Sequence, residues 1–199
     1  RSSTNQAPRK ITKGNDGESI NIKLELRSLA DVGLVGFPNA GKSTFLNKIS
    51  SAKPKIADYP FTTLRPHLGT IKYSDNSFVI ADIPGIIEGA SDGHGLGIKF
   101  LKHISRTGIL LFFLEAFSEI SVLDQFLKLK KELGDFSERL LEKEFYIVVT
   151  KIDLIDEETR FETLNTFNAK EFTNVFGISS VTGEGVQELL DDMSRKIFI

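Results

Sequence analysis

The stretch from Gly36 to Thr44 has residue types and a spacing that suit phosphate binding. It reads Gly-Phe-Pro-Asn-Ala-Gly-Lys-Ser-Thr and fits the pattern G-x-x-x-x-G-K-[ST]. Gly36 and Gly41 allow the backbone to curl, so that successive N–H groups point inward at an anion. Lys42 adds a positive charge near the β- and γ-phosphates, and Ser43 offers a hydroxyl to Mg²⁺. The pattern predicts a nucleoside triphosphate site.

The flanking segments predict the strand and the helix that this loop requires. Residues 31–36 are mostly apolar, which is typical of a strand buried on both faces. Residues 42–50 predict a helix whose positive N-terminal end points at the phosphates. This context argues against the alternative, a chance match in a glycine-rich turn.

Strand and helix patterns alternate through the rest of the chain. Further strands are predicted at 67–73, 77–82, 109–115, 145–150 and 174–178, and further helices at 98–106, 120–142, 157–169 and 184–197. Such alternation predicts a three-layer α/β fold with a mostly parallel sheet, the architecture of a phosphate-loop nucleotide-binding domain.

The N-terminal part has a different pattern. Residues 20–27 alternate between apolar and polar side chains, as in a strand with one wet face. We therefore interpret residues 1–29 as a β-strand remnant of a preceding domain and residues 30–199 as the nucleotide-binding domain. The alternative is that this strand is an extra edge strand of the main domain.

The composition restricts the class of protein. Of the 199 residues, 40% are hydrophobic and 26% are charged, as in an ordinary globular protein, and the net charge of −2 shows no overall attraction to nucleic acid. The absence of cysteine excludes disulfides and thiolate metal sites. No run is apolar for long enough to span a bilayer and no signal peptide is visible, so we expect a cytoplasmic protein. Because the chain opens with Arg1, we expect a fragment.

A second motif, Asp82-Ile83-Pro84-Gly85, ends the apolar strand at 77–82. In a phosphate-loop protein, a carboxylate at this strand end holds Mg²⁺, often through water. Gly85 can bring its backbone N–H to a γ-phosphate, since it has no side chain in the way. By itself an Asp at a strand end is more often a cap or turn residue.

Two segments have the composition of nucleotide-sensitive loops. One contains Phe61-Thr62-Thr63-Leu64-Arg65, where a threonine could ligate Mg²⁺ once a γ-phosphate draws the loop in. The other carries five glycines between Gly85 and Gly97, whose ordering has a large entropy cost. We expect 57–65 and 85–98 to order with a nucleoside triphosphate and Mg²⁺ and to loosen with the diphosphate; the alternative is that both are ordinary surface loops.

A third motif, Thr150-Lys151-Ile152-Asp153, suits guanine recognition. Asp153 can accept hydrogen bonds from N1–H and N2–H of guanine, and the stem of Lys151 can lie against the base. The backbone of Ser179-Ser180-Val181, after the next strand, could donate to guanine O6. The alternatives are that Asp153 caps a helix and that the serine segment is an ordinary turn.

Together these stretches resemble a translation-factor-class GTPase, and more narrowly the Obg family. The resemblance covers residues 30–199 and rests on 31–44, 59–64, 82–90 and the glycine-rich run. It implies a GTP-binding and GTP-hydrolysing switch, a monomer that acts in large ribosomal subunit assembly and growth control. It also implies that 1–29 is the end of the β domain that precedes the G domain in this family.

The resemblance assigns roles to individual residues. Mg²⁺ would be held by Ser43, Thr63 and, through water, Asp82, and the catalytic residues would be Lys42, Thr63, Gly85 and Asn39. The nucleotide contacts implied are Gly36, Phe37, Pro38, Asn39, Ala40, Gly41, Lys42, Ser43, Thr44, Phe61, Thr62, Thr63, Leu64, Arg65, Asp82, Ile83, Pro84, Gly85, Thr150, Lys151, Ile152, Asp153, Ser179, Ser180 and Val181.

The sequence departs from related GTPases at two places. Thr150 stands where the base motif usually has Asn, so a bracing carboxamide is lost and weaker affinity is expected. Ile86 follows Gly85 where Ras-type enzymes have a water-orienting Gln, so unaided hydrolysis is expected to be slow. Asn39 is a candidate ligand for K⁺, which would stabilise the developing charge instead; the alternative is that Asn39 only braces the loop.

Two other functions are compatible with the motifs. One is an ATP-using relative, against which Asp153 argues. The other is a ribosome-binding module that keeps the nucleotide as a structural ligand with negligible hydrolysis, against which Lys42, Ser43, Thr63 and Gly85 argue. We also expect full ribosome binding to need the preceding domain, because this chain is mildly acidic and ribosomal RNA is a polyanion.

Overall fold

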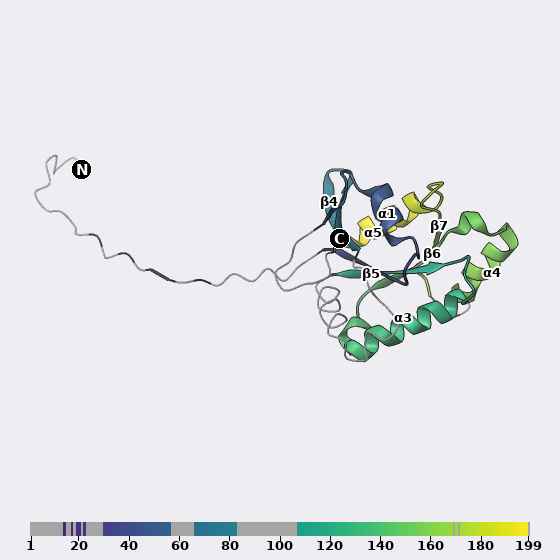
Figure 1. Ribbon diagram of the computed structural model, residues 1–199. Helices are drawn as coiled ribbons and strands as arrows, with labels where there is room; N and C mark the ends of the chain where they lie inside the picture. Colours follow the sequence, from purple (N-terminus) through teal and green to yellow (C-terminus); the bar gives the residue numbers. More distant parts are fainter. Residues whose placement is uncertain are drawn as a thin grey trace, which may run out of the picture.

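In the computed structural model, one sheet lies between two layers of helices (Figure 1). The structure describes residues 30–56, 66–82, 107–168 and 172–198, and the single positions 14, 17, 19, 20, 22 and 170. The strands are β1 (Val32–Gly36), β2 (Lys55–Ile56), β3 (His67–Tyr73), β4 (Asn76–Asp82), β5 (Ile109–Glu115), β6 (Phe145–Thr150) and β7 (Val175–Ile178). The α-helices are α1 (Lys42–Ile49), α3 (Val122–Phe136), α4 (Glu157–Asn168) and α5 (Val186–Ile197), with short 3₁₀ helices η1 (Glu138–Leu140) and η2 (Ile152–Leu154).

The sheet is mostly parallel, as the sequence predicts. Its seven strands follow the order β2-β3-β4-β1-β5-β6-β7. β1 pairs in parallel with β4 and β5, and β5–β6 and β6–β7 are also parallel. Only β3 is antiparallel to its neighbours β2 and β4 within the described sheet. The carboxyl ends of β1, β4, β5, β6 and β7 therefore lie along one edge, which we call the carboxyl edge.

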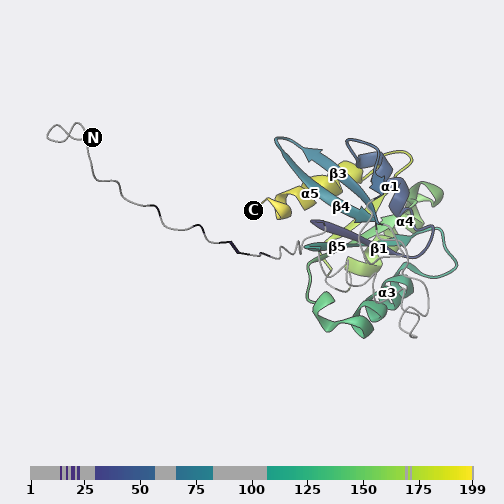
Figure 2. The same ribbon diagram turned by 60° about the vertical axis from the view of Figure 1, so that its left-hand side comes forward.

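The alternating side chains of β5 show why its sequence is continuously apolar. Leu110, Phe112 and Leu114 pack with α3 and α4 in one core cluster. Leu111 and Phe113 pack with α1 and α5 in the other. Figure 2 shows α1 and α5 on one side of the sheet and α3 on the other. A strand covered on both faces has no wet side, so it reads as an unbroken apolar run.

Several element boundaries differ from the predictions. The helix predicted over 120–142 ends at Phe136, because the chain turns extended at Ser137 (φ −162°) before η1. The last helix starts at Val186 rather than 184, after Gly183 and Gly185 adopt positive φ angles of 94° and 70°. The two-residue strand β2 had no recognisable sequence pattern.

Other predictions lie outside the described residues. These are the helix at 98–106, most of the strand at 20–27 with the proposed domain remnant 1–29, and the loops 57–65 and 85–98. Among the described helices, none combines the length and the apolar character needed to cross a bilayer.

Candidate functional site at the carboxyl edge

The phosphate-loop segment joins β1 to α1 at the carboxyl edge, and its two glycines are needed for different reasons. A Cβ at Gly36 would lie 2.7 Å from the carbonyl oxygen of Phe113, so no side chain fits there. Gly41, the N-cap of α1, has φ 91°, which glycine adopts readily. Asn39 also has a positive φ, 63°, a conformation that Asn tolerates better than most residues. The loop thus has the tight curl that the pattern predicts.

Lys42 is buried against this loop. Its Nζ donates to the carbonyl oxygens of Gly36 and Phe37, each at 2.8 Å. Burial lowers the pKa of Lys42, and the negative charge of Asp82 partly opposes that shift. A phosphate oxygen would be a charged and therefore stronger acceptor than these carbonyls.

Ser43 and Asp82 form the oxygen-rich part of the site. The Ser43 hydroxyl donates to Oδ2 of Asp82 at 2.5 Å. Asp82 is 3% exposed, and its Oδ1 is buried with no hydrogen-bond partner in the part of the chain that the structure describes. A buried carboxylate oxygen without a partner is costly, and hard oxygen donors are those that Mg²⁺ prefers. These residues fit a magnesium ion.

Thr150 ties the base motif to the phosphate loop. Its buried hydroxyl lies 2.9 Å from the carbonyl oxygen of Ala40 and 3.2 Å from that of Leu114, and it can donate to either. The sequence reasoning considered only the carboxamide that Thr lacks. In the fold the shorter side chain still links β6 to the loop that would hold the phosphates.

Asp153 lies in η2 with an exposed side chain, beside Ile152, which is buried. The helix that follows, α4, is capped by another residue, because Thr159 N–H donates to Oδ1 of Asp156 at 2.8 Å. The alternative of Asp153 as the cap of that helix is therefore wrong. Its carboxylate remains at the surface of the carboxyl edge.

In the turn after β7, Ser179 makes hydrogen bonds within the turn itself. The N–H of Ser179 donates to the carbonyl oxygen of Glu184 at 3.0 Å, and its hydroxyl accepts from Thr182 N–H at 3.1 Å. Ser179 is fully buried, so its backbone N–H serves the turn and is not presented to a base. Ser180 and Val181 follow at the surface side of the turn, and Val181 is 74% exposed.

The structure brings together the phosphate loop, Asp82, the base motif and the serine turn at one edge. The remaining predicted contacts lie outside the described residues: Phe61, Thr62, Thr63, Leu64, Arg65, Ile83, Pro84 and Gly85. Sequence reasoning missed two neighbours of the base motif, Glu115 and Gln125. Glu115 is paired with Lys151, and Gln125 is buried against the Glu115 backbone. Glu115 could have been found, because it ends an apolar strand as Asp82 does.

A glycine-curled loop between a buried parallel strand and a helix, with a lysine, a serine and a strand-end aspartate, defines a phosphate-loop nucleotide-binding domain. The chain belongs to the 50S ribosome-binding GTPase family, whose model matches residues 31–151.

The curated relatives carry the narrower name that the motifs suggested. The chain is 53% identical to GTPase Obg of Chloroherpeton thalassium over 195 residues, which cover 98% of this chain and 57% of that protein. It is 50% identical to GTPase Obg of Magnetococcus marinus over 196 residues, covering 96% of this chain and 51% of the relative. The resemblance to the Obg family is confirmed, and the chain spans about half the length of these relatives.

Solved structures share the fold at lower identity. Aquifex aeolicus Era bound to GDP·AlF₄⁻ aligns with a TM-score of 0.62 and 22% identity, over 83% of this chain and 56% of Era. The cytosolic domain of the T. maritima FeoB iron transporter in a GDP form aligns with a TM-score of 0.65 and 20% identity, over 84% of this chain and 63% of that domain. These matches confirm the predicted phosphate-loop α/β fold.

Proposed function

We propose that this chain binds GTP and hydrolyses it to GDP and phosphate, as a switch domain of a larger protein. The proposal rests on one observation: residues suited to a triphosphate and residues suited to a guanine base lie at the same edge of the sheet. Lys42 and the orphaned oxygen of Asp82 suit the triphosphate and its metal, and Asp153 suits the base. Thr150 joins these two groups of residues through Ala40.

At the phosphate end, Lys42 would exchange its two loop carbonyls for oxygens of the β- and γ-phosphates. Ser43, Thr63 and, through water, Asp82 would hold Mg²⁺, which neutralises phosphate charge when bound. The backbone N–H of Gly85 would hold the γ-phosphate in place. The proposed ion would take phosphate oxygens of the nucleotide as further ligands.

At the base end, Asp153 would accept from N1–H and N2–H of guanine, while Ile152 supports its turn. The test is Asp153→Asn, which should exchange a preference for GTP over XTP for the reverse, since an amide can donate where a carboxylate only accepts. Sites of this kind discriminate by roughly 10⁴-fold or more. Asp156→Asn, three positions away in a helix cap, is the matched control and should leave base preference unchanged.

Binding of GTP and ATP and turnover of GTP, measured on the unsubstituted chain, separate the competing functions. Preferential binding of ATP over GTP by the unsubstituted chain would support the ATP-using alternative. Tight GTP binding without turnover would support a module that keeps its nucleotide as a structural ligand. A variant Asp153→Asn that still prefers GTP would show that another residue reads the base.

Hydrolysis is proposed to depend on K⁺ through Asn39. This residue is exposed within the loop and holds a positive φ of 63°, and its carboxamide oxygen is a neutral ligand suited to a weakly hydrated cation. Turnover in K⁺ should exceed turnover in Na⁺, and Asn39→Ala should abolish the difference while GTP still binds. A K⁺-responsive GTPase is the positive control. Equal turnover rates in both salts would contradict the K⁺ role and favour the alternative, in which Asn39 only stabilises the loop.

The proposed partner is the large ribosomal subunit, in the cytoplasm. The support is the description of the matching family, a 50S ribosome-binding GTPase. Because the net charge is −2, this chain alone should pellet only weakly with large subunits, and more with a GTP analogue than with GDP. Tight pelleting would contradict a need for a preceding domain, and equal pelleting with both nucleotides would contradict a switch.

A further inference from the structure

Glu115 lies at the end of β5, beside the base motif. It is the register partner of Thr150 on β6, and Ala116 N–H donates to the carbonyl oxygen of Thr150 at 3.0 Å. Its carboxylate oxygen Oε1 lies 2.5 Å from Nζ of Lys151. The two side chains are 23% and 32% exposed, so the pair is less screened by water than an ordinary surface pair.

The backbone of Glu115 is held by a buried amide. Oε1 of Gln125 accepts from Glu115 N–H at 2.9 Å, and its Nε2 donates to the carbonyl oxygen of Glu115 at 2.9 Å. The same Nε2 donates to the carbonyl oxygen of Ile120 at 2.8 Å. Gln125 is 2% exposed and sits in the first turn of α3, after its N-cap Ser121. The position of the Glu115 carboxylate is thus set by the sheet and by α3 together.

Lys151 needs such support. Its φ of 59° is in the left-handed region, which is unfavourable for a residue with a long side chain. The ion pair joins the end of the Lys151 side chain to Glu115 at the end of β5. A lysine held in one extended conformation before the ligand arrives loses less side-chain entropy on binding.

We propose that Glu115 is a positioning residue for the nucleotide base, which acts by holding the Lys151 stem in place against guanine. The inference rests on the proposed guanine site. Glu115 affects nucleotide affinity and not the chemical step, because it lies at the base motif and its contact is with Lys151. Glu115 also lines a cavity of about 320 Å³ together with Phe37 and Pro38, so a change of its side chain does not force the core to repack.

The test is a double-mutant cycle of Glu115→Gln and Lys151→Ala, with dissociation constants for GDP and a GTP analogue and with kcat at saturating GTP. Glu115→Gln should weaken both nucleotides about fivefold and leave kcat within about twofold. In the Lys151→Ala background, Glu115→Gln should have no further effect, because its route of action is already removed. Glu119→Gln, in the exposed loop before α3, is the matched control and should change nothing.

The outcomes separate this inference from the proposed function. If Lys151→Ala weakens binding but Glu115→Gln does not, or if the two effects add, Glu115 does not act through Lys151 and the inference is overturned. If Lys151→Ala leaves affinity unchanged, the proposed base site itself is wrong and the inference falls with it. A fall in kcat with Glu115→Gln at unchanged affinity would also overturn it.

Discussion

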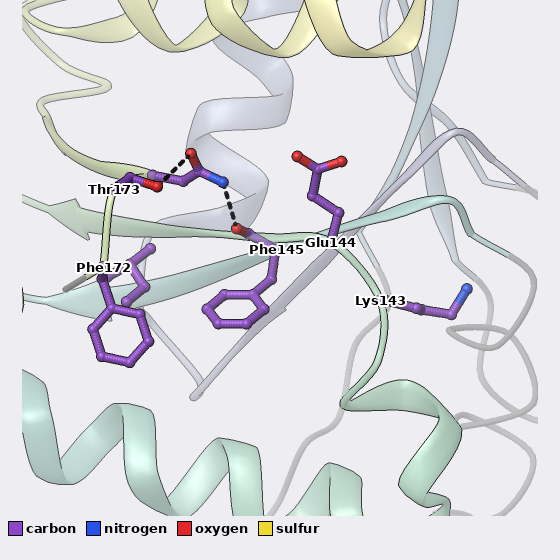
Figure 3. A pocket seen from close by; sticks show the side chains of 7 residues that line it. Lys143, Glu144, Phe145, Phe172 and Thr173 are labelled. Atoms are coloured by element: carbon purple, nitrogen blue, oxygen red, sulfur yellow. Dashed lines mark hydrogen bonds between the residues drawn. The ribbon is translucent and has the colours of Figure 1, made fainter. Parts of the chain in front are cut away.

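The two ends of the sheet are built in opposite ways. At the end where β6 and β7 begin, Phe145 and Phe172 turn their rings toward α3 and line a cavity of about 240 Å³ (Figure 3). Phe126 of α3 packs against both, with ring centroids 5.8 and 5.5 Å away. Lys130 places its Nζ 5.8 Å above the Phe126 and Phe145 rings. Ring contacts among these phenylalanines dominate the packing between α3 and this end of the sheet.

At the carboxyl edge, the buried charged groups of Lys42 and Asp82 have few hydrogen-bond partners among the described residues. Lys42 donates only to carbonyls of its own loop, and one oxygen of Asp82 has no hydrogen-bond partner among the described residues. Burying such groups reduces stability, so their presence here indicates a ligand that completes them. From this difference we expect the aromatic end to contribute mainly to stability and the carboxyl edge mainly to nucleotide binding, so that substitutions at each end should separate the two properties.

The largest effect is expected from Phe126→Ala at the aromatic end. Loss of a fully buried ring that touches Phe112, Phe145, Phe167 and Phe172 should lower the free energy of unfolding by about 3–5 kcal/mol, measured by urea denaturation. GDP affinity, measured well below the unfolding transition, should not change. Phe117→Ala, at a site 63% exposed, is the control and should shift stability by less than about 0.5 kcal/mol.

Lys42→Met is expected to have a comparably large effect, but on activity and not on stability. Removal of the charge that is proposed to contact the phosphates should reduce kcat for GTP by roughly 10²–10³-fold. Stability without nucleotide should change little, because removal of a desolvated ammonium is offset by the loss of its hydrogen bonds to Gly36 and Phe37 and of its attraction to Asp82. The control is Lys48→Met on the exposed side of α1. A large loss of stability in Lys42→Met would contradict the separation of the two ends.

Thr150→Val should affect both properties, because this residue connects the sheet to the loop. Loss of the hydroxyl leaves the carbonyls of Ala40 and Leu114 without this donor and should reduce stability by about 1 kcal/mol. GDP affinity should fall severalfold, as the loop is less well held. Thr150→Ser retains the hydroxyl and should behave like the parent chain; equal behaviour of the Val and Ser variants would show that the hydroxyl contributes nothing.

The smallest effect concerns pH. Burial lowers the pKa of Lys42 in the folded chain below its ordinary value of 10.5, so between these two pKa values the unfolded chain binds more protons. Stability of the nucleotide-free protein should therefore rise with pH toward 10.5, relative to Lys42→Met, in paired urea titrations. Saturating GDP should diminish the difference, because a phosphate next to the ammonium favours its charged form. A difference that falls as the pH rises would contradict the assigned cause.

Local patterns in the sequence determined the class of this protein. The phosphate loop is a continuous stretch, so the glycines that curl it and the lysine that follows are recognisable from spacing alone. The apolar run at 109–115 likewise predicted a strand, and the structure shows that its side chains alternate between the two cores.

Only the tertiary structure decided which distant residues support the site. Thr150 reaches Ala40 across 110 positions of chain, and Lys151 reaches Glu115 across 36. No local periodicity encodes such a pair, since strand order in the sheet sets it. Likewise, Asp153 and Asp156 are both plausible helix caps by residue type, and the fold assigns that role to Asp156 because its carboxylate meets the N–H of Thr159.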